Sequence, residues 1–262
     1  MNIGFIGAGN MGSALAKSIS KVLNTKVYIY DISQEKSYDL ANKIGAFSTN
    51  FDKVVLDSDI LFIGVKPNVL PEVLSKVGKI VKPTTLTVSM AAGVTIAKIE
   101  DSLGRKLPII RIMPNTPVLV GEGVTAYAKN DIVTDKNVTD FLNCMQYTGT
   151  LEPLDECDID SFCAIAGCGP AYAYMFIEAL AVGAEKCGIS LDKAIRYAAL
   201  TLRGAAHMTL ESDSTPDTLC KNVCSPGGAT IEGVKVLESK DFESTVASAI
   251  EAAFKRTKEL GK

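Results

Sequence analysis

A glycine-rich turn between an apolar strand and a helix constrains the fold more than any other feature of this chain. Asn2–Ile6 is a short apolar run typical of a strand, and Asn10–Val22 has the apolar spacing of a helix. The turn between them is a G-x-G-x-x-G segment with the sequence Gly7-Ala8-Gly9-Asn10-Met11-Gly12. In this context the first glycine permits a tight turn, the second lets a pyrophosphate approach the backbone, and the third lets helix and strand pack closely. The sequence therefore predicts a dinucleotide-binding unit at the start of the chain.

Strand-like and helix-like segments alternate through the first two-thirds of the chain. Further short apolar runs typical of strands are Lys26–Tyr30, Ile60–Val65, Leu86–Ser89, Ile109–Met113 and Val124–Ala128. Helical periodicity marks Val69–Lys79 and Gln34–Ile44, and Gly45 is a typical helix end. Alternation of this kind predicts an α/β fold with a doubly wound, mostly parallel sheet of the Rossmann type.

The pattern changes after residue 152, and from Ile159 onward only helical periodicity is convincing. The expected helices are Ala171–Cys187, Leu191–Leu210, Pro216–Cys224, Ala229–Glu238 and Thr245–Leu260. Because the first of these is apolar around its whole circumference, we expect it to be buried on all sides. We therefore divide the chain into a dinucleotide-binding domain, 1–152, and an all-α domain, 153–262. The second domain could be core packing alone or a subunit interface, and we favour an intertwined dimer.

Composition argues against several classes of function. The 262 residues carry a net charge of −3 and no basic tract, so no nucleic-acid partner is expected. The seven cysteines include no C-x-x-C pair, and there is one histidine, so we expect neither a metal site nor a disulfide framework. The N-terminus has no basic signal-peptide region, and no run of roughly 18 uncharged apolar residues occurs. We expect a cytoplasmic protein without a membrane span.

Asp31 ends the second expected strand, 19 residues after Gly12. An acidic residue at this place hydrogen-bonds the adenosine ribose 2′-hydroxyl and repels a 2′-phosphate, which favours NADH over NADPH. The alternative is an aspartate that only caps the helix or stabilises the turn, since Asp31-Ile32-Ser33 precedes a helical segment.

Three other loops follow expected strands and should meet at the carboxyl edge of the sheet, where ligands bind in open α/β folds. They are Val65-Lys66-Pro67, Ala91-Ala92-Gly93 and the loop that contains Asn115. The small residues of the second loop leave room for the nicotinamide half of a dinucleotide. Each loop alone could be ordinary, but three at one edge favour a cofactor site.

The second half contains another glycine turn before a helix, Ser225-Pro226-Gly227-Gly228-Ala229-Thr230. Successive N–H groups at a helix start bind anions, and a carboxylate fits better than a phosphate because no arginine or lysine is adjacent. The alternative is a plain capping turn. His207 lies within a helix and is expected to be partly exposed rather than a general base. Chemistry that needs little acid–base help, such as hydride transfer to a protonated imine, suits this residue set.

With these motifs in this order, the chain resembles the Δ1-pyrroline-5-carboxylate reductases. The most specific match is the stretch from Thr218 to Glu238, which contains the second glycine turn. Other segments that match the family, in order, are Gly4–Gly12, Val65–Pro67, Arg111–Pro117 and Gly167–Tyr172. The resemblance covers nearly the whole chain.

The resemblance implies the last step of proline synthesis, in which NAD(P)H reduces (S)-1-pyrroline-5-carboxylate to L-proline. It also implies a helical domain that interlocks two subunits, with dimers that often assemble into a decamer. Thr230 would hydrogen-bond the ring nitrogen and is the implied catalytic residue. The implied substrate-binding residues are Glu156, Asp213, Ser225, Gly227, Gly228, Ala229 and Thr230, and Asn222 would lie near the cofactor.

The chain departs from the family pattern at several positions. A small polar residue is common where Asp31 stands, in members that favour NADPH, so Asp31 puts that preference in doubt here. Ala166 and Cys168 replace two serines, Lys221 replaces a common acid, and Asp213 is shorter than the usual glutamate.

Two alternatives remain on sequence grounds. A β-hydroxyacid dehydrogenase shares the N-terminal pattern but uses a lysine on the first long helix of its second domain, and residues 171–185 contain none. A non-catalytic dinucleotide-binding paralogue is disfavoured by the intact segment from Ser225 to Thr230.

Overall fold

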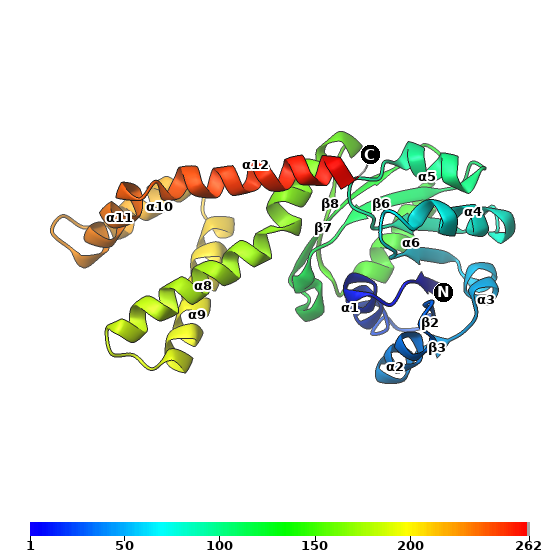
Figure 1. Ribbon diagram of the computed structural model, residues 1–262, viewed down its shortest axis with the longest axis horizontal. Coiled ribbons are helices and arrows are strands. Elements are labelled where there is room, and N and C mark those ends of the chain that lie inside the picture. Colours follow the sequence, from blue (N-terminus) through cyan, green and yellow to red (C-terminus); the bar gives the residue numbers. More distant parts are fainter. Residues whose placement is uncertain (261–262) are drawn as a thin grey trace. The chain divides into compact units, whose positions relative to one another are not determined.

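The computed structural model describes residues 1–260, and the chain divides into two compact units (Figure 1). The sheet unit contains Met1–Cys168 together with the C-terminal residues from Ala252 onward. The helical unit contains Gly169–Glu251. The boundary thus lies 16 residues later than the sequence prediction, at 168 rather than 152, and the C-terminal part of the last helix belongs to the sheet unit.

The later boundary has a physical reason in the packing of the segment after residue 158. Ile159, Cys163 and Ala164 are buried, and the first two pack in the apolar cluster on one face of the sheet. Thr257 from the last helix is also buried, and its hydroxyl donates to the Cys163 Sγ at 3.7 Å. Helical periodicity revealed the change of secondary structure but not which core these residues join.

Within residues 1–260, eight strands form one sheet in the order β3-β2-β1-β4-β5-β6-β7-β8. Their bounds are β1 Asn2–Ile6, β2 Lys26–Tyr30, β3 Phe47–Ser48, β4 Ile60–Ile63, β5 Leu86–Ser89, β6 Ile109–Met113, β7 Gly123–Lys129 and β8 Gly149–Pro153. All neighbouring pairs are parallel except β6 with β7. The predicted doubly wound sheet is therefore confirmed, with two further strands, β3 and β8, that periodicity did not reveal.

Helices cover both faces of the sheet (Figure 1). The helices up to the boundary are α1 Asn10–Ile19, α2 Gln34–Ile44, α3 Phe51–Asp57, α4 Leu70–Ile80, α5 Ile96–Leu103, α6 Asp135–Met145 and α7 Ile159–Phe162, with short turns η1 Thr116–Val120, η2 Glu156–Asp158 and π-helical η3 Cys163–Gly167. Helices α3, α5 and α6 were not predicted from the sequence pattern. Each begins after a capping side chain, from Asn50, Thr95 and Thr134 respectively, which was the available signal.

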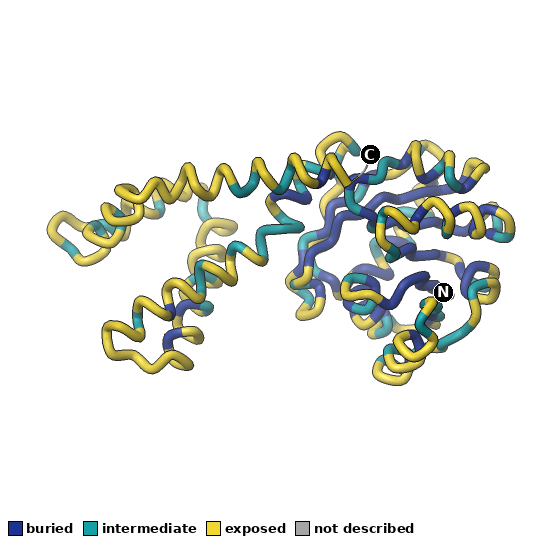
Figure 2. Tube along the Cα trace, viewed as in Figure 1, coloured by how far each residue is buried: buried dark blue, intermediate teal, exposed yellow. Residues whose placement is uncertain are grey.

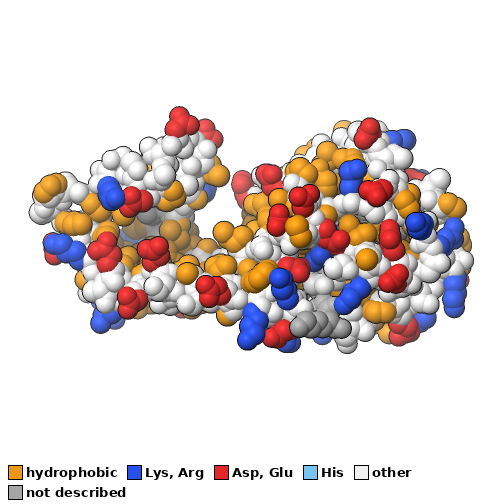
Figure 3. Space-filling view, turned by 90° about the horizontal axis from the view of Figure 1, so that it is seen from above, with side chains coloured by type: hydrophobic (Ala, Val, Ile, Leu, Met, Phe, Trp, Pro, Cys, Tyr) orange, Lys and Arg blue, Asp and Glu red, His pale blue; other side chains and the backbone are white. Residues whose placement is uncertain are grey.

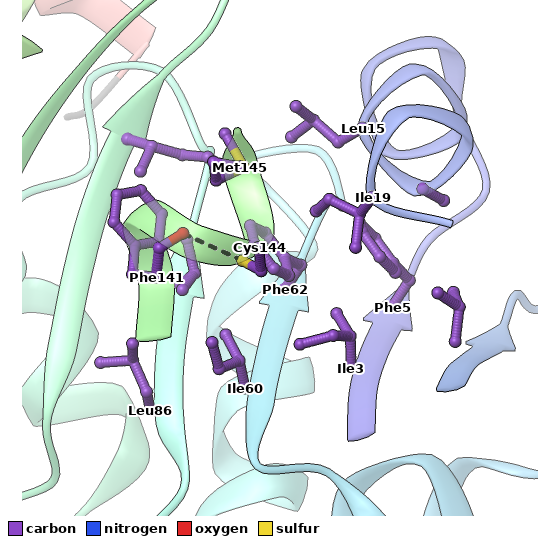
Figure 4. Packing of buried hydrophobic residues seen from close by; sticks show 14 of the residues in the cluster. Ile3, Phe5, Leu15, Ile19, Ile60, Phe62, Leu86, Phe141, Cys144 and Met145 are labelled. Atoms are coloured by element: carbon purple, nitrogen blue, oxygen red, sulfur yellow. Dashed lines mark hydrogen bonds between the residues drawn. The ribbon is translucent and has the colours of Figure 1, made fainter. Parts of the chain in front are cut away.

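Two apolar clusters lie on opposite faces of the sheet. One joins the central strands to α1 and α6, and Figure 4 shows Phe5 of β1 stacked on Phe62 of β4, with ring centroids 4.9 Å apart. Cys144 lies in this cluster, and burial raises the pKa of its thiol far above the usual value. It is a buried packing group. The other cluster joins the opposite face to α3, α4, α5 and α7.

The helical unit buries very little of itself (Figure 2). Its helices are α8 Gly169–Lys186, α9 Leu191–Glu211, α10 Pro216–Val223, α11 Ala229–Ser239 and the first part of α12 Phe242–Leu260. The helices were predicted correctly, with bounds shifted by a few residues. The expectation that the first is buried on all sides is wrong for the single chain, because only Ala181 of α8 is buried.

The apolar character of α8 has a second consequence. The helical stretch Glu156–Lys186 is long and apolar enough to cross a membrane, judged by length and composition alone. The stricter criterion of the sequence analysis, an uncharged run, did not detect it. An interface helix that is covered by another subunit has the same composition, so this observation alone is weak evidence for a membrane span.

Candidate functional site

Steric constraints explain two of the three glycines in the first turn. Gly7 has a φ of +102°, and a Cβ there would lie 2.6 Å from the Gly64 carbonyl oxygen. A Cβ on Gly12 would lie 2.3 Å from the Gly7 carbonyl oxygen, so helix and strand approach as closely as predicted. Gly9 differs, because a Cβ built there has no atom within 4 Å apart from its immediate neighbours in the chain. Its missing side chain leaves open space above the turn, as a bound pyrophosphate requires.

The start of α1 is free to bind an anion. Gly9 is its N-cap residue and supplies no side-chain hydrogen bond to the first turn. The exposed N–H groups and the positive end of the helix dipole are then available to phosphate oxygens. A hollow of about 690 Å³ borders the turn and includes Gly9, Asn10, Met11 and Lys17 in its lining. These residues fit a dinucleotide pyrophosphate.

Asp31 both stabilises the turn and carries charge at the end of β2. Its Oδ2 accepts the N–H of Ala8 at 2.7 Å, and its Oδ1 accepts the N–H of Ser33 at 2.8 Å. The second bond is the turn-stabilising alternative weighed from the sequence, so that role is present. Each carboxylate oxygen can accept a further bond. Contact with the adenosine ribose stays a prediction.

The predicted edge loops do come together. In register, Ile6 of β1 pairs with Ile63 of β4, Ile63 pairs with Ser89 of β5, and Ser89 pairs with Arg111 of β6. The four strands therefore end side by side, and the loops after them share the carboxyl edge. A Cβ on Gly64 would lie 3.2 Å from the Met90 sulfur and 3.6 Å from Gly12 Cα, so three of the loops touch.

The residues of these loops differ in exposure. Lys66 is exposed, Val65 and Pro67 are partly exposed, Ala92 is partly exposed, and Ala91 and Gly93 are buried. Gly93 has a φ of +75°, which favours glycine in the turn before α5. Contact of this loop with nicotinamide stays a prediction.

The Asn115 side chain connects two segments of the sheet unit by hydrogen bonds, in addition to any role in cofactor binding. Its side chain is 7% exposed, its Nδ2 donates to the Ala166 carbonyl at 3.0 Å, and its Oδ1 accepts the N–H of Val124 at 2.9 Å. The amide thereby joins the loop after β6 to the π-helical turn. Direct contact with the cofactor stays a prediction.

Glu156 lies in an ion-pair network. Its Oε1 is 3.3 Å from Nη1 of Arg111, which is 1% exposed, and it also accepts the N–H of Ile96 at 2.6 Å. Arg111 Nη2 is 2.5 Å from Asp160 Oδ1. Glu156 retains 32% exposure, so contact with substrate stays a prediction. The sequence analysis did not single out Arg111 or Asp160, although a charge within the apolar run IIRIM was a usable signal.

The second glycine turn, in the helical unit, is also open. Gly227 has a φ of +72°, Gly228 is the N-cap of α11 without a side-chain hydrogen bond, and the Gly228 N–H donates to the Ser225 carbonyl at 3.0 Å. Ser225, Gly227, Ala229 and Thr230 are exposed, and Gly228 is partly exposed. The first N–H groups of α11 are therefore reachable, as an anion cradle requires.

The remaining predicted residues of the helical unit lie near this turn in sequence. Asp213 is exposed in the loop between α9 and α10, and Asn222 is exposed on α10, which leads to the turn. His207 is exposed on α9 with its Nε2 3.8 Å from Glu211, which agrees with the expectation of an exposed helix residue. Among residues 1–260, no three or more His, Cys, Asp or Glu side chains form a group suited to a metal ion.

Comparison with known proteins covers both units. The sequence model described as pyrroline-5-carboxylate reductase dimerisation matches residues 156–260, and the one described as NADP oxidoreductase coenzyme F420-dependent matches residues 2–93. The pyrroline-5-carboxylate reductase of Escherichia coli (strain K12) is 38% identical over 264 residues, 99% of this chain and 98% of that protein.

Solved structures agree with the sequence relatives. A Plasmodium falciparum pyrroline carboxylate reductase with NADP bound superposes with a TM-score of 0.92 and 33% identity, covering 100% of this chain and 98% of that one. A Mycobacterium tuberculosis 3-hydroxyisobutyrate dehydrogenase, with a TM-score of 0.54 and 14% identity over 97% of this chain and 92% of that one, is similar in fold alone.

Proposed function

The chain belongs to the pyrroline-5-carboxylate reductase family, and from that premise we propose how its residues reduce (S)-1-pyrroline-5-carboxylate to L-proline. It is an NAD(P)H-dependent oxidoreductase of proline biosynthesis. The observation that carries the mechanism is that each unit presents one open glycine turn at the uncapped start of a helix. One turn suits a pyrophosphate and the other suits a small carboxylate.

The first turn and the carboxyl edge of the sheet hold the cofactor. Gly9 leaves the space that the pyrophosphate needs, and the N–H groups at the start of α1 donate to it. The proposed contacts around them come from Gly7 to Gly12, Asp31, Val65, Lys66, Pro67, Ala91, Ala92, Gly93, Asn115 and, from the helical unit, Asn222. The reduced nicotinamide supplies the hydride when it is bound.

The second turn holds the substrate. The first N–H groups of α11 donate to the substrate carboxylate, with Ser225, Gly227, Gly228 and Ala229 shaping the pocket. Thr230 is the catalytic residue in this proposal, because its hydroxyl oxygen accepts the N–H of the protonated ring imine and so fixes the ring. Glu156 and Asp213 add negative charge that favours the cationic imine. The protein contributes mainly by placing substrate and cofactor in register.

We propose NADH as the preferred coenzyme. The Asp31 oxygens accept two backbone N–H groups at the end of β2, and a 2′-phosphate beside this acidic side chain would be repelled. NADP is bound in the related Plasmodium structure, so the preference would be a property of this chain rather than of all its relatives.

We also propose that the protein is a cytoplasmic homodimer that assembles further into a decamer. The dimer would form through the helical unit, whose large apolar side chains are exposed in the single chain and which the dimerisation model matches. A surface of this kind is too apolar to stay in contact with water.

The experiment that tests the function is a steady-state assay of NADH and NADPH oxidation with pyrroline-5-carboxylate as substrate. We expect turnover with both coenzymes, a higher kcat/KM with NADH, and L-proline as the product. Absence of turnover with either coenzyme would contradict the function, and a higher kcat/KM with NADPH would contradict only the role of Asp31.

A further inference from the structure

A charged side chain is buried in a strand whose other residues are all apolar. Arg111 is the central residue of β6, its neighbours in the strand are apolar, and its side chain is 1% exposed. A buried guanidinium is costly unless it is paired, and an apolar residue of similar size is often at least as stabilising. A stable fold alone does not require an arginine at this position.

The guanidinium joins three elements on one face of the sheet. Nη1 is 3.3 Å from Oε1 of Glu156 in η2, and Nη2 is 2.5 Å from Oδ1 of Asp160 in α7. The same Glu156 oxygen accepts the N–H of Ile96, the first residue of α5, at 2.6 Å. Arg111 therefore links β6 through one carboxylate to α5 and through another to α7.

Both ends of this network lead to segments used in the reaction. Ile96 comes three residues after Gly93, so the network fixes the downstream end of the loop proposed to face nicotinamide. Asp160 is followed by the π-helical turn Cys163–Gly167, which Asn115 also ties to the carboxyl edge through the Ala166 carbonyl. π-Helical turns occur frequently at functional sites. The segment then continues into α8 of the helical unit.

We propose that Arg111 is a positioning residue for hydride transfer, acting with Glu156 and Asp160 to fix the Ala91–Gly93 loop and the segment that leads into α8. The inference rests on the proposed function. It gives Glu156 a second task, through Arg111 and Ile96, beside the negative charge that it adds near the substrate. Arginine suits this task because its planar group donates to two carboxylates at once, whereas a lysine ammonium is a single point charge.

The test measures kcat, substrate KM and the deuterium isotope effect with coenzyme deuterated at the transferred position. The variants are Asp160→Asn, Glu156→Gln and the triple Arg111→Met with both of these changes. The triple variant removes the guanidinium without leaving two unpaired carboxylates. The matched control is Arg105→Met, since Arg105 also bonds to protein in the sheet unit, through the Gly78 and Val81 carbonyls.

We expect kcat to fall roughly tenfold in each single variant and about 100-fold in the triple variant, because small displacements of reacting groups cost this much. The isotope effect should rise in all three, since misplacement slows the hydride step itself. Arg105→Met should match the wild type in both readouts. A loss of purely structural stability would lower the active fraction and leave the isotope effect and KM unchanged.

Two results would overturn the proposal. One is that all three variants show the same isotope effect and the same kcat per active site as the wild type. The other is an effect confined to substrate KM in Glu156→Gln, with Asp160→Asn unchanged, which would make Glu156 a direct substrate contact. Wild-type protein without pyrroline-5-carboxylate turnover would instead contradict the proposed function, so the two failures are distinguishable.

Discussion

The sheet unit buries its apolar side chains, whereas the helical unit leaves most of its apolar side chains exposed. Strands β4, β5 and β6 are buried along their whole length, and helices on both faces complete the core within one chain. In α8 and α9 of the helical unit only Ala181, Ala194 and Ala198 are buried. Figure 3 shows orange, apolar side chains at the surface of the helices.

The difference separates two meanings of an apolar segment. In a parallel sheet, burial on both faces is supplied by the chain itself, through the helices that connect the strands. A long apolar helix that its own chain does not cover must be covered by another molecule. In α8 the exposed side chains include the large apolar residues Tyr174 and Met175. The helical unit is therefore expected to depend on a second subunit, and the sheet unit is not.

The largest expected effect comes from placing a charge on the helical surface. Met175, which is 71% exposed, should be buried in the dimer, so Met175→Asp buries an unpaired carboxylate at a cost of several kcal/mol. We expect dissociation by light scattering and loss of turnover, while coenzyme binding to the sheet unit persists. The matched control is Leu23→Asp, because Leu23 is 86% exposed on the sheet unit and should tolerate the change. If Met175→Asp is tolerated as well as Leu23→Asp, the helical surface does not differ from the surface of the sheet unit in the way described above.

The next effect contrasts two glycines of the first turn. Gly12→Ala places a Cβ 2.3 Å from the Gly7 carbonyl oxygen. We therefore expect the free energy of unfolding to fall by about 1–3 kcal/mol, and we expect coenzyme binding to weaken as well. Gly9→Ala meets no protein atom, so its thermal stability should match the wild type while coenzyme Kd rises. Calorimetry and fluorescence titration separate the two. Unchanged coenzyme Kd in Gly9→Ala would exclude the pyrophosphate from the turn.

Substitutions in the second glycine turn should change the kinetic constants for the substrate and leave coenzyme binding unchanged. Thr230→Ala removes one hydrogen bond to a charged group, worth about 1.5–3 kcal/mol, so kcat/KM for substrate should fall roughly 10- to 100-fold. Gly228→Val should raise substrate KM, because even its Cβ would lie 3.1 Å from Ser225 atoms. Coenzyme Kd should stay at the wild-type value in both. Wild-type kcat/KM in Thr230→Ala would remove its catalytic role.

The smallest expected effect concerns coenzyme choice within the sheet unit. Asp31→Ser should shift the ratio of kcat/KM values towards NADPH by roughly tenfold, or about 1.4 kcal/mol. The variant also loses the bonds that Asp31 accepts from Ala8 and Ser33, so kcat/KM with NADH should fall as well. An unaltered coenzyme ratio would leave Asp31 with its turn-stabilising role alone.

Local patterns predicted most of the fold and the two glycine turns around which the proposed sites are built. Four strands, including β1 and β6, have the predicted bounds, and both glycine turns lie at the start of a helix as expected. β3 was missed because two residues carry no periodicity. β8 was missed because a sheet-edge strand need not be apolar, and Gly149–Pro153 has exposed and partly exposed residues only.

What the sequence by itself determined is most of the strands and helices, the two glycine turns at helix starts and the edge of the sheet predicted to hold the cofactor, because these follow from short-range spacing of glycines and apolar side chains. Only the tertiary structure decided which partner each charged group takes. Asp31 binds a residue 23 positions away, Arg111 binds one 45 positions away, and Glu156 binds one 60 positions away. Hydrogen bonds and ion pairs depend on a few ångströms of separation in space, which no local periodicity records.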